Sequence, residues 1–311
     1  MRVAYVLRYY PTLSETFVTR EIHGLLAQGV EVVVVSMGTR ADAVLATDLP
    51  DVPVLACPRR FRLARLLRRL PRVDRFHAHF DGEASALAME LAAAREVPFS
   101  VTVHAVDLFV PRPGIARRLR AARPVVTVCA HHRDWIAREY GVVAEVVRST
   151  VDLPERTADP SRQPPHVVAV ARDVPKKDLA RLRRAAVGVR LTVASDLPHP
   201  DVLDLLRSAQ LFALPCRVAP SGDRDGVPVA MLEAMAMGLP VVTRPLAGIP
   251  ELLDSGVGWI AHDFERALRE ALEDPVERAR RGSRARERIA TSWSGPSPTG
   301  SLLEVWGRVR L

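Results

Sequence analysis

The stretch from Asp223 to Leu253 reads DRDGVPVAMLEAMAMGLPVVTRPLAGIPELL and predicts a helix followed closely by a buried strand. Pro228 suits the first turn of a helix because its missing N–H would have had no partner within the helix, so we expect the helix to begin at about Val227. Gly238 is a typical helix end. The next residues, PVVT at 240–243, have the apolar and β-branched character of a parallel strand covered on both faces. A helix that leads directly into such a strand is typical of an α/β fold.

Glu233 lies within this expected helix among methionine, leucine and alanine residues, and it is the only charged residue between Asp225 and Arg244. Burying an unpaired carboxylate in apolar surroundings costs several kcal/mol. We therefore expect Glu233 to have a polar partner, which the neighbouring sequence does not supply.

The same alternation of strand and helix runs along the whole chain, which predicts doubly wound parallel sheets. The expected strands lie at residues 3–7, 31–36, 54–57, 76–80, 99–104, 125–129 and 144–147, and then at 166–171, 189–194, 211–215, 240–243 and 258–261.

A polar, proline-rich segment divides this pattern in two. Residues 153–165, LPERTADPSRQPP, have the composition of a linker between domains. We therefore expect a Rossmann-like domain at residues 1–152 and a second one at residues 166–290. The basic, helical tail at residues 291–311 is expected to be a C-terminal helix that can cross back to the first domain. Because ligands of open parallel sheets bind at the carboxyl ends of the strands, the loops after the strands are the places to look for chemistry.

The composition narrows the class of protein. With 311 residues and 48% hydrophobic content, the chain can bury one or two substantial cores. Its three cysteines, Cys57, Cys129 and Cys216, are odd in number and widely spaced, which argues against a disulfide framework and a zinc site. No apolar run approaches the roughly 20 residues of a membrane span, and the N-terminus lacks the apolar run of a signal peptide. We expect a cytoplasmic protein.

The formal net charge of +8 comes mainly from arginine and would attract phosphate groups on nucleotides, lipids or nucleic acid. A scattered, solvated arginine-rich surface is the alternative. Residues 59–70, RRFRLARLLRRL, have the pattern of a cationic amphipathic helix, which suits an anionic membrane surface or a polyphosphate. The same pattern also suits an ordinary surface helix that rests on the sheet, so association with a membrane surface stays an open alternative.

The loop after the first strand contains a helix start. Thr12 and Glu15 have the spacing of a capping box, and the apolar residues from Phe17 onward mark one helical face. The free N–H groups of a helix start at this edge of the sheet can receive a phosphate or a sugar hydroxyl.

Histidines follow two of the central strands. His77 and His79 alternate along one strand, so their side chains point to the same side of the sheet. Asp81 is a conceivable third ligand for a metal ion, but packing or contact with a ligand is the favoured explanation. His104 and Asp107 follow the next strand, where a histidine can contact a ligand or remain a hydrogen-bonded interior residue.

Arg172 and Lys177 follow the first strand of the second half, at a strand-to-helix turn. A guanidinium fork and an ammonium group together suit a diphosphate. An exposed basic turn in a basic protein is the alternative.

Taken together, these features resemble the GT-B-fold retaining glycosyltransferases of family 4, in particular the branch of colanic-acid and exopolysaccharide biosynthesis. The resemblance rests on PTLSETFVTREI at residues 11–22, on VTVHAVD at 101–107, on the turn at 172–177 and on the stretch at 223–253. It implies an α/β, GT-B architecture, in which two Rossmann-like domains face each other across a cleft.

The resemblance assigns the donor site to the second domain. Asp225 and Glu233 match the family's pair of acidic residues, with Glu233 accepting hydrogen bonds from the ribose and Asp225 contacting sugar hydroxyls. Arg172 and Lys177 match the clamp for the donor diphosphate, helped by the main chain of Gly226 and Val227.

His104 matches the histidine that lines the reacting centre, so the implied catalytic residues are His104, Asp225 and Glu233. The implied residues on the acceptor side are Ser14, Glu15, Thr16, His79 and Asp107. Asp178 departs from the family pattern, which usually has a glycine after the diphosphate lysine. The chain is also shorter than the family between Lys177 and Pro198, which predicts a shortened second domain.

The reaction that the resemblance implies is transfer of a hexose, with retention and without a metal or cofactor, from a nucleotide-diphosphate sugar to an acceptor hydroxyl. UDP or GDP is the expected nucleotide. The expected acceptor is a polysaccharide intermediate, a glycolipid or other lipid-linked sugar, or a natural product, and no nucleic-acid partner is expected.

Two alternatives follow from the same features. A sugar-nucleotide epimerase or a pseudo-glycosyltransferase would have the same fold. A non-catalytic binder of polyanions or membrane surfaces would use the arginines, but it would leave the isolated carboxylate of Glu233 unexplained.

Overall fold

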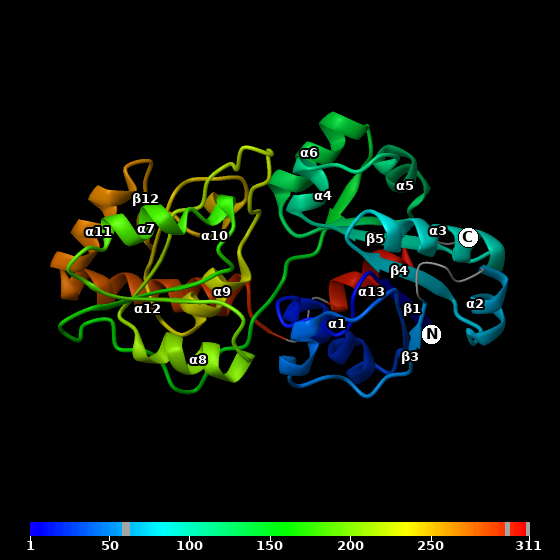
Figure 1. Ribbon diagram of the computed structural model, residues 1–311, viewed down its shortest axis with the longest axis horizontal. Helices are drawn as coiled ribbons and strands as arrows, with labels where there is room; N and C mark the ends of the chain where they lie inside the picture. The colour runs from blue at the N-terminus through cyan, green and yellow to red at the C-terminus, as the bar shows by residue number, and fades with distance from the viewer. Residues whose placement is uncertain (58–62, 296–298, 309–311) are drawn as a thin grey trace. The chain divides into compact units, whose positions relative to one another are not determined.

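The computed structural model describes residues 1–57, 63–295 and 299–308 of the chain (Figure 1). The chain forms two compact units. The first contains residues 1–148 and the C-terminal helix α13 (Thr299–Gly307), and the second contains residues 149–295. All the strands expected from the sequence are present, with ends that lie within two residues of the predicted ones.

The first unit is built on a seven-stranded parallel sheet of order β3-β2-β1-β4-β5-β6-β7. One of its inner strands, β1, is a largely apolar run buried on both faces, as expected of a parallel sheet between layers of helices. The strands are β1 (Arg2–Leu7), β2 (Glu31–Ser36), β3 (Val54–Ala56), β4 (Arg75–His79), β5 (Phe99–Val103), β6 (Val125–Thr127) and β7 (Ala144–Val146).

The register of this sheet places polar side chains from different strands side by side. Tyr5 of β1 lies opposite His77 of β4, and His77 lies opposite Ser100 of β5. β4 ends at His79 and β5 ends at Val103, so the residues that follow both strands meet at the same edge of the sheet.

Helices cover the sheet of the first unit. They are α1 (Thr16–Ala27), η1 (Ala41–Leu45), α2 (Leu63–Arg69), α3 (Glu83–Arg95), α4 (Ala105–Phe109), α5 (Ile115–Ala121), α6 (Ala130–Tyr140) and α13. The predicted capping box at the start of α1 is wrong. The helix begins at Thr16 with Glu15 at the N-cap position, because residues 12–15 form a turn.

Two further predicted helices, α2 and α13, are present over part of their predicted ranges. The predicted basic helix at 59–70 is present as α2, while residues 59–62 lie outside the described residues. Leu66 of α2 and Leu70 are buried in the core of the unit, so the apolar face of this helix packs on the protein itself. Leu302 and Trp306 of α13 are buried in the first unit, in the same cluster as Tyr5.

The second unit has a shorter parallel sheet of five strands, in the order β12-β11-β10-β8-β9. The strands are β8 (His166–Val170), β9 (Arg190–Ala194), β10 (Leu211–Leu214), β11 (Val241–Thr243) and β12 (Trp259–Ile260). The surrounding helices are η2 (Pro175–Lys177), α7 (Leu179–Ala185), α8 (His199–Ser208), α9 (Val229–Ala236), α10 (Ile249–Leu252), α11 (Phe264–Glu273) and α12 (Pro275–Ser292).

The stretch at 223–253 forms the expected helix, strand and second helix. Pro228 takes the N-cap position of α9, so the helix begins two residues later than predicted, at Val229. The backbone φ angle of Gly238 is +83°, a conformation that favours glycine, and the chain then enters β11. Gly282 of α12 packs so closely here that a Cβ atom at this position would lie 2.2 Å from the carbonyl oxygen of Gly238.

Residues 149–165, most of which the sequence marks as a linker, pack on the second unit. Val151 is buried, and its N–H donates to the carbonyl of Trp293 at 3.0 Å. The N–H of Ala158 donates to the carbonyl of Met237 at 2.9 Å. Main-chain hydrogen bonds near the start and in the middle of this segment therefore make it part of the unit.

Several arginines stabilise the second unit by donating to main-chain carbonyl groups. Arg278 of α12 is fully buried and donates to the carbonyls of Pro160 at 2.9 Å, Ala271 at 2.9 Å and Leu272 at 2.8 Å. Arg286, on the same helix, donates to the carbonyl of Pro154 at 2.8 Å and to that of Ala236. Among the described residues, no helix combines the length and apolar character needed to span a bilayer.

Candidate functional site

A cluster of opposite charges lies at the carboxyl edge of the sheet in the second unit. The Nζ atom of Lys177, at the end of η2, lies 2.8 Å from Oδ2 of Asp225, in the loop that precedes α9. Lys176 Nζ lies 3.5 Å from Oδ1 of Asp225 and 3.1 Å from Oδ1 of Asp223. The loop after β8 and the loop after β10 therefore meet through two lysines and two aspartates.

Lys177 and Asp225 hold each other in the charged state. Burial favours the neutral form of each, but the attraction of Asp225 outweighs it and raises the pKa of Lys177. Burial likewise favours a higher pKa for Asp225, but Lys177 and Lys176 lower that pKa below its usual value. The thiol of Cys216 donates to Oδ2 of Asp225 at 3.4 Å, and burial together with Asp225 raises the pKa of this thiol.

Three other predicted donor-site residues lie close in the chain to this cluster. Arg172 is exposed in the loop after β8, near enough for its charge to act on the pKa of Lys177. Gly226 is buried and Val227 is half-buried, directly between Asp225 and the start of α9.

Asp178 follows Lys177 in a left-handed conformation, with a φ angle of +47°. Glycine adopts this conformation without the steric cost that a Cβ atom brings, and aspartate tolerates it better than most residues. The departure at Asp178 therefore keeps the backbone geometry of the turn, which lets Lys177 point back toward Asp225.

Glu233 is 8% exposed on α9, and its partner is a histidine that the sequence reasoning missed. His199 Nε2 lies 3.0 Å from Oε1 of Glu233. His199 opens α8, and the signal that could have found it is the His-Pro dipeptide at a helix start after β9. The expected polar partner of Glu233 is thus present within the unit.

A second polar cluster lies in the first unit, around Glu21 of α1. Oε1 of Glu21 accepts from the Tyr5 hydroxyl at 2.6 Å and lies 2.9 Å from Nε2 of His79. His77 Nε2 lies 3.8 Å from the same oxygen, so both histidines of β4 point to one side of the sheet, as predicted. The other nitrogen of His77 contacts the hydroxyl of Ser100 at 2.9 Å.

His79 also reaches the residue that follows β5. Its Nδ1 lies 3.2 Å from Nε2 of His104, the N-cap residue of α4. The ring of His104 is further surrounded by Phe80 and Phe17, with ring centroids 4.3 Å and 4.9 Å away. Phe80 has a φ angle of +66°, which is a strained conformation for an aromatic residue and places its ring against His104.

Two histidines of this cluster, His77 and His104, are held in the neutral form by their environment. Burial and the neighbouring His79 lower the pKa of His104 well below its ordinary value. Burial, His79, Arg75 and His104 have the same effect on the pKa of His77.

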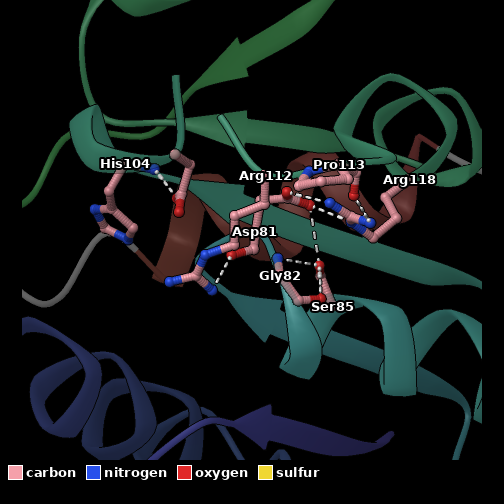
Figure 2. Close-up of polar contacts among 8 residues, drawn as sticks. Asp81, Gly82, Ser85, His104, Arg112, Pro113 and Arg118 are labelled. Carbon is pink, nitrogen blue, oxygen red and sulfur yellow. Dashed lines mark hydrogen bonds and ion pairs between the residues drawn. The ribbon is translucent and has the colours of Figure 1, made fainter. Parts of the chain in front are cut away.

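Asp81 is not part of this cluster, so its consideration as a metal ligand beside the histidines is wrong. Figure 2 shows Asp81 paired with Arg118, whose Nε and Nη2 atoms each donate to a carboxylate oxygen at 2.6 Å. Ser85 donates to Asp81 at 3.0 Å. Glu21 was missed because it lies on α1, far from the histidines in the chain.

Glu21, His77 and His79 have ligand atoms within 4.8 Å of one another, and this donor set could hold a divalent metal ion such as zinc. In this structure the polar atoms of these three side chains already make hydrogen bonds. Oε1 of Glu21 is shared by Tyr5 and His79 at hydrogen-bond distances, so a metal ion would have to replace these contacts.

Asp107 anchors the main chain of His104. Its Oδ2 accepts a hydrogen bond from the main-chain N–H of His104 at 2.8 Å, which Figure 2 shows as the dashed line beside His104. Burial raises the pKa of Asp107 to about 7, with hydrogen bonds from the main chain of His104 and Asp81 acting in the opposite direction. The charge of Asp81 adds to the increase.

The structure brings together three of the predicted residues of the first unit, His79, His104 and Asp107. Ser14, Glu15 and Thr16 lie in the turn at the start of α1. The next residue, Phe17, contacts the ring of His104, so this turn lies on the same side as the cluster.

Two family models match the chain. Residues 14–155 match the model described as Glycosyltransferase Family 4, and residues 153–277 match the model described as Glycosyl transferases group 1. Together they span most of the chain.

Several curated proteins are similar to parts of the chain. The amylovoran biosynthesis glycosyltransferase AmsK of Erwinia amylovora is 48% identical over 65 residues, which is 21% of this chain and 16% of AmsK. The putative colanic acid biosynthesis glycosyltransferase WcaL of Escherichia coli K12 is 39% identical over 99 residues, which is 30% of this chain and 24% of WcaL. The chain thus aligns with less than a third of the length of these relatives. A glycogen synthase of Mycobacterium tuberculosis H37Rv is 26% identical over 291 residues, covering 76% of this chain and 69% of the synthase.

Solved structures of glycosyltransferases share the fold. A glycosyltransferase from Rickettsia africae ESF-5 has a TM-score of 0.72 at 12% identity, covering 99% of this chain and 98% of that chain. WaaG, a glycosyltransferase involved in lipopolysaccharide biosynthesis, has a TM-score of 0.66 at 15% identity, covering 99% and 100%. These similarities show that the two parallel-sheet units have the GT-B fold.

Proposed function

Because this chain belongs to the group 1 glycosyltransferases of family 4, we propose that it transfers a hexose from a nucleotide-diphosphate sugar to an acceptor hydroxyl. The transfer proceeds with retention of the anomeric configuration and without a metal ion. The observation that carries the proposal is the basic turn at 172–177, which lies against Asp225 at the carboxyl edge of the second sheet.

The diphosphate of the donor binds at this turn. Arg172 and Lys177 supply positive charge, and the N–H groups of Gly226 and Val227 precede the start of α9, where a helix favours anions. Without a donor, Lys177 is held by Asp225. When the donor binds, Lys177 lies between the diphosphate and Asp225, and Asp225 accepts a hydrogen bond from a hydroxyl of the sugar.

Glu233 binds the ribose of the donor. His199 holds one oxygen of the carboxylate, Oε1, at 3.0 Å. The second oxygen, Oε2, is then oriented to accept hydrogen bonds from the ribose hydroxyls. This arrangement gives a functional reason for a carboxylate on a helix that is otherwise apolar.

The bond between the sugar and the diphosphate breaks as negative charge develops on the leaving group. Lys177, Arg172 and the main-chain N–H groups stabilise that charge, which is the largest contribution a protein makes to such a transfer. His104 lines the reacting centre and the acceptor hydroxyl supplies the nucleophile, so no nucleophile from the protein is needed.

We infer the substrate class from the same relatives. AmsK and WcaL are named for amylovoran and colanic acid biosynthesis, and a relative in Corynebacterium glutamicum, 32% identical over 121 residues, is named as a GDP-mannose-dependent mannosyltransferase acting on a phosphatidylinositol monomannoside. The last of these names supports a GDP-hexose donor, with a UDP-hexose as the alternative. Together the names support a saccharide or lipid-linked acceptor, with contact to a membrane surface where the acceptor is a lipid.

The test is donor binding by isothermal titration calorimetry with UDP- and GDP-hexoses. We expect Glu233→Gln to weaken binding of the donor by at least tenfold, because a hydrogen bond to a charged group is worth about 1.5–3 kcal/mol. Glu273→Gln, at an exposed position of α11, is the matched control and should leave binding unchanged.

Product analysis then separates the reaction classes. Release of nucleoside diphosphate that requires an acceptor supports transfer, whereas an altered sugar nucleotide without an acceptor indicates an epimerase. Binding that is absent for every donor, with Glu233→Gln indistinguishable from the wild type, would contradict the proposal.

A further inference from the structure

A continuous line of hydrogen bonds crosses the first unit and ends at His104. It runs from the hydroxyl of Tyr5 to Oε1 of Glu21 at 2.6 Å, from the same oxygen to Nε2 of His79 at 2.9 Å, and from Nδ1 of His79 to Nε2 of His104 at 3.2 Å. The four residues come from β1, α1, β4 and the loop after β5. Tyr5, Glu21 and His79 are buried, while His104 is half-buried.

Such a line is costly unless it is completely satisfied, because each buried polar group loses its contacts with water. A core of apolar residues could fill the same space without that cost. Because of this cost, we expect the line of hydrogen bonds to have a functional role. That role lies at its half-buried end, where the ring of His104 lies at the carboxyl edge of the sheet.

The direction of donation can be worked out from Glu21. An ionised carboxylate only accepts hydrogen bonds, so Oε1 accepts one from the Tyr5 hydroxyl and one from the N–H at Nε2 of His79. When His79 carries a single proton, on Nε2, its Nδ1 is an acceptor. His104 must then donate from its own Nε2, which leaves its Nδ1 without a proton.

We propose that Glu21 and His79 are positioning residues, which fix His104 in the tautomer that carries its proton on Nε2 and presents Nδ1 as an acceptor for a substrate hydroxyl. The inference rests on the proposed glycosyl transfer, in which His104 lines the reacting centre. In the other tautomer, Nδ1 would carry a proton and could only donate to a hydroxyl oxygen.

The surroundings of His104 restrict it further. Asp107 holds its main-chain N–H at 2.8 Å, and the rings of Phe80 and Phe17 lie against its imidazole. The packing fixes the position of the ring, and the hydrogen bond that His104 donates to Nδ1 of His79 selects which nitrogen of His104 is protonated.

The test uses two variants that each remove one hydrogen bond from Glu21. His79→Phe keeps a ring but breaks the link to His104. Tyr5→Phe removes only the hydroxyl at the far end and leaves the link from Glu21 through His79 to His104. The tautomer of His104 is read from its ¹⁵N chemical shifts, with thermal unfolding measured on the same samples.

We expect the wild type and Tyr5→Phe to hold the Nε2–H tautomer of His104, and His79→Phe to show a mixture of both tautomers. With a donor and an acceptor, kcat of His79→Phe should fall on the order of tenfold while the KM for the donor stays unchanged, because the loss is that of about one hydrogen bond at the reacting centre. Tyr5→Phe should keep its kcat even though it also loses stability.

The inference is overturned if the wild type holds the Nδ1–H tautomer or a mixture, or if His79→Phe leaves both the tautomer and kcat unchanged. A failure of the proposed function appears differently. No donor would then be turned over by any variant, while the ¹⁵N shifts would still report whether His79 controls His104.

Discussion

Replacing Asp225 with asparagine should destabilise the second unit by about 3 kcal/mol. The side chains of Asp225 and Lys177 are 12% and 15% exposed, and their charged atoms lie 2.8 Å apart. Coulomb's law at an effective dielectric constant of about 20 gives roughly 6 kcal/mol for this pair, and the desolvation of the carboxylate offsets about half of it. Asp225→Asn removes the charge but keeps the shape, and it leaves Lys177 buried without its main partner.

The pH dependence of this loss follows from the two pKa shifts. The pKa of Asp225 is lowered in the folded protein, so its contribution is present above the ordinary pKa of about 4 and is lost as the pH falls through the lowered value. The pKa of Lys177 is raised, so its contribution is present below about 10.4 and is lost as the pH rises through the raised value. The full difference between wild type and variant should therefore appear between about pH 5 and pH 9.

Urea unfolding followed by circular dichroism measures the difference, and Asp223→Asn is the matched control. Asp223 pairs with Lys176 at 3.1 Å, but its side chain is 24% exposed and Lys176 keeps Asp225 as a second partner. Its loss should be at most about 1 kcal/mol. Equal losses in the two variants, or a loss for Asp225→Asn that is the same at pH 7 and pH 3, would refute the reasoning.

Two other predictions concern stability. Gly282→Ala should lower the free energy of unfolding by about 2 kcal/mol in urea titrations, because the new Cβ atom would lie 2.2 Å from the carbonyl oxygen of Gly238 and α12 would have to move. Ser283→Ala, at the exposed neighbouring position, is the control. An equal loss of stability in both variants would exclude the contact with Gly238 as the cause. Asp107→Asn should be more stable than the wild type at pH 8 by roughly 2–4 kcal/mol and similar to it near pH 4. The reason is that the pKa of Asp107 is raised to about 7, so the favourable protonated state of the wild type is lost as the pH rises through that value. Unfolding curves at the two pH values measure this difference, and a variant that is less stable at pH 8 would contradict it.

The sheets could be predicted from the sequence because their strands are buried on both faces. Runs such as VVVV at 32–35 and FALP at 212–215 are apolar throughout, and helices separate them at regular intervals. The exact start of α1 could not be predicted, because the spacing of Thr12 and Glu15 also fits the turn that the chain forms before Thr16. Local pattern thus defines the element but not its first residue.

Much of the candidate site was visible as residue types in loops, while the contacts were not. Glu233 stood out as an isolated carboxylate, but its partner His199 lies 34 positions away in the chain. In the same way, Glu21 and His79 are 58 positions apart and meet only because α1 covers the strand next to β4. Asp81 looked closer to the histidines by sequence, but the strand ends at His79 and Phe80 leaves the extended conformation with a φ angle of +66°. The alternation of side chains therefore stops before Asp81, which pairs with Arg118 instead.

The arginine–carbonyl contacts of α12 bear on how the basic character of this chain is understood. A carbonyl oxygen satisfies a guanidinium group without cancelling its charge, so Arg278 and Arg286 connect segments of the second unit while their positive charge is retained. Lysine could not replace them, since an ammonium group lacks the planar fork that reaches several carbonyls at once. Part of the net charge of +8 is therefore a by-product of the arginines that hold the second unit together. Binding to a heparin or nucleic-acid column would reflect these structural arginines as much as recognition of a natural partner.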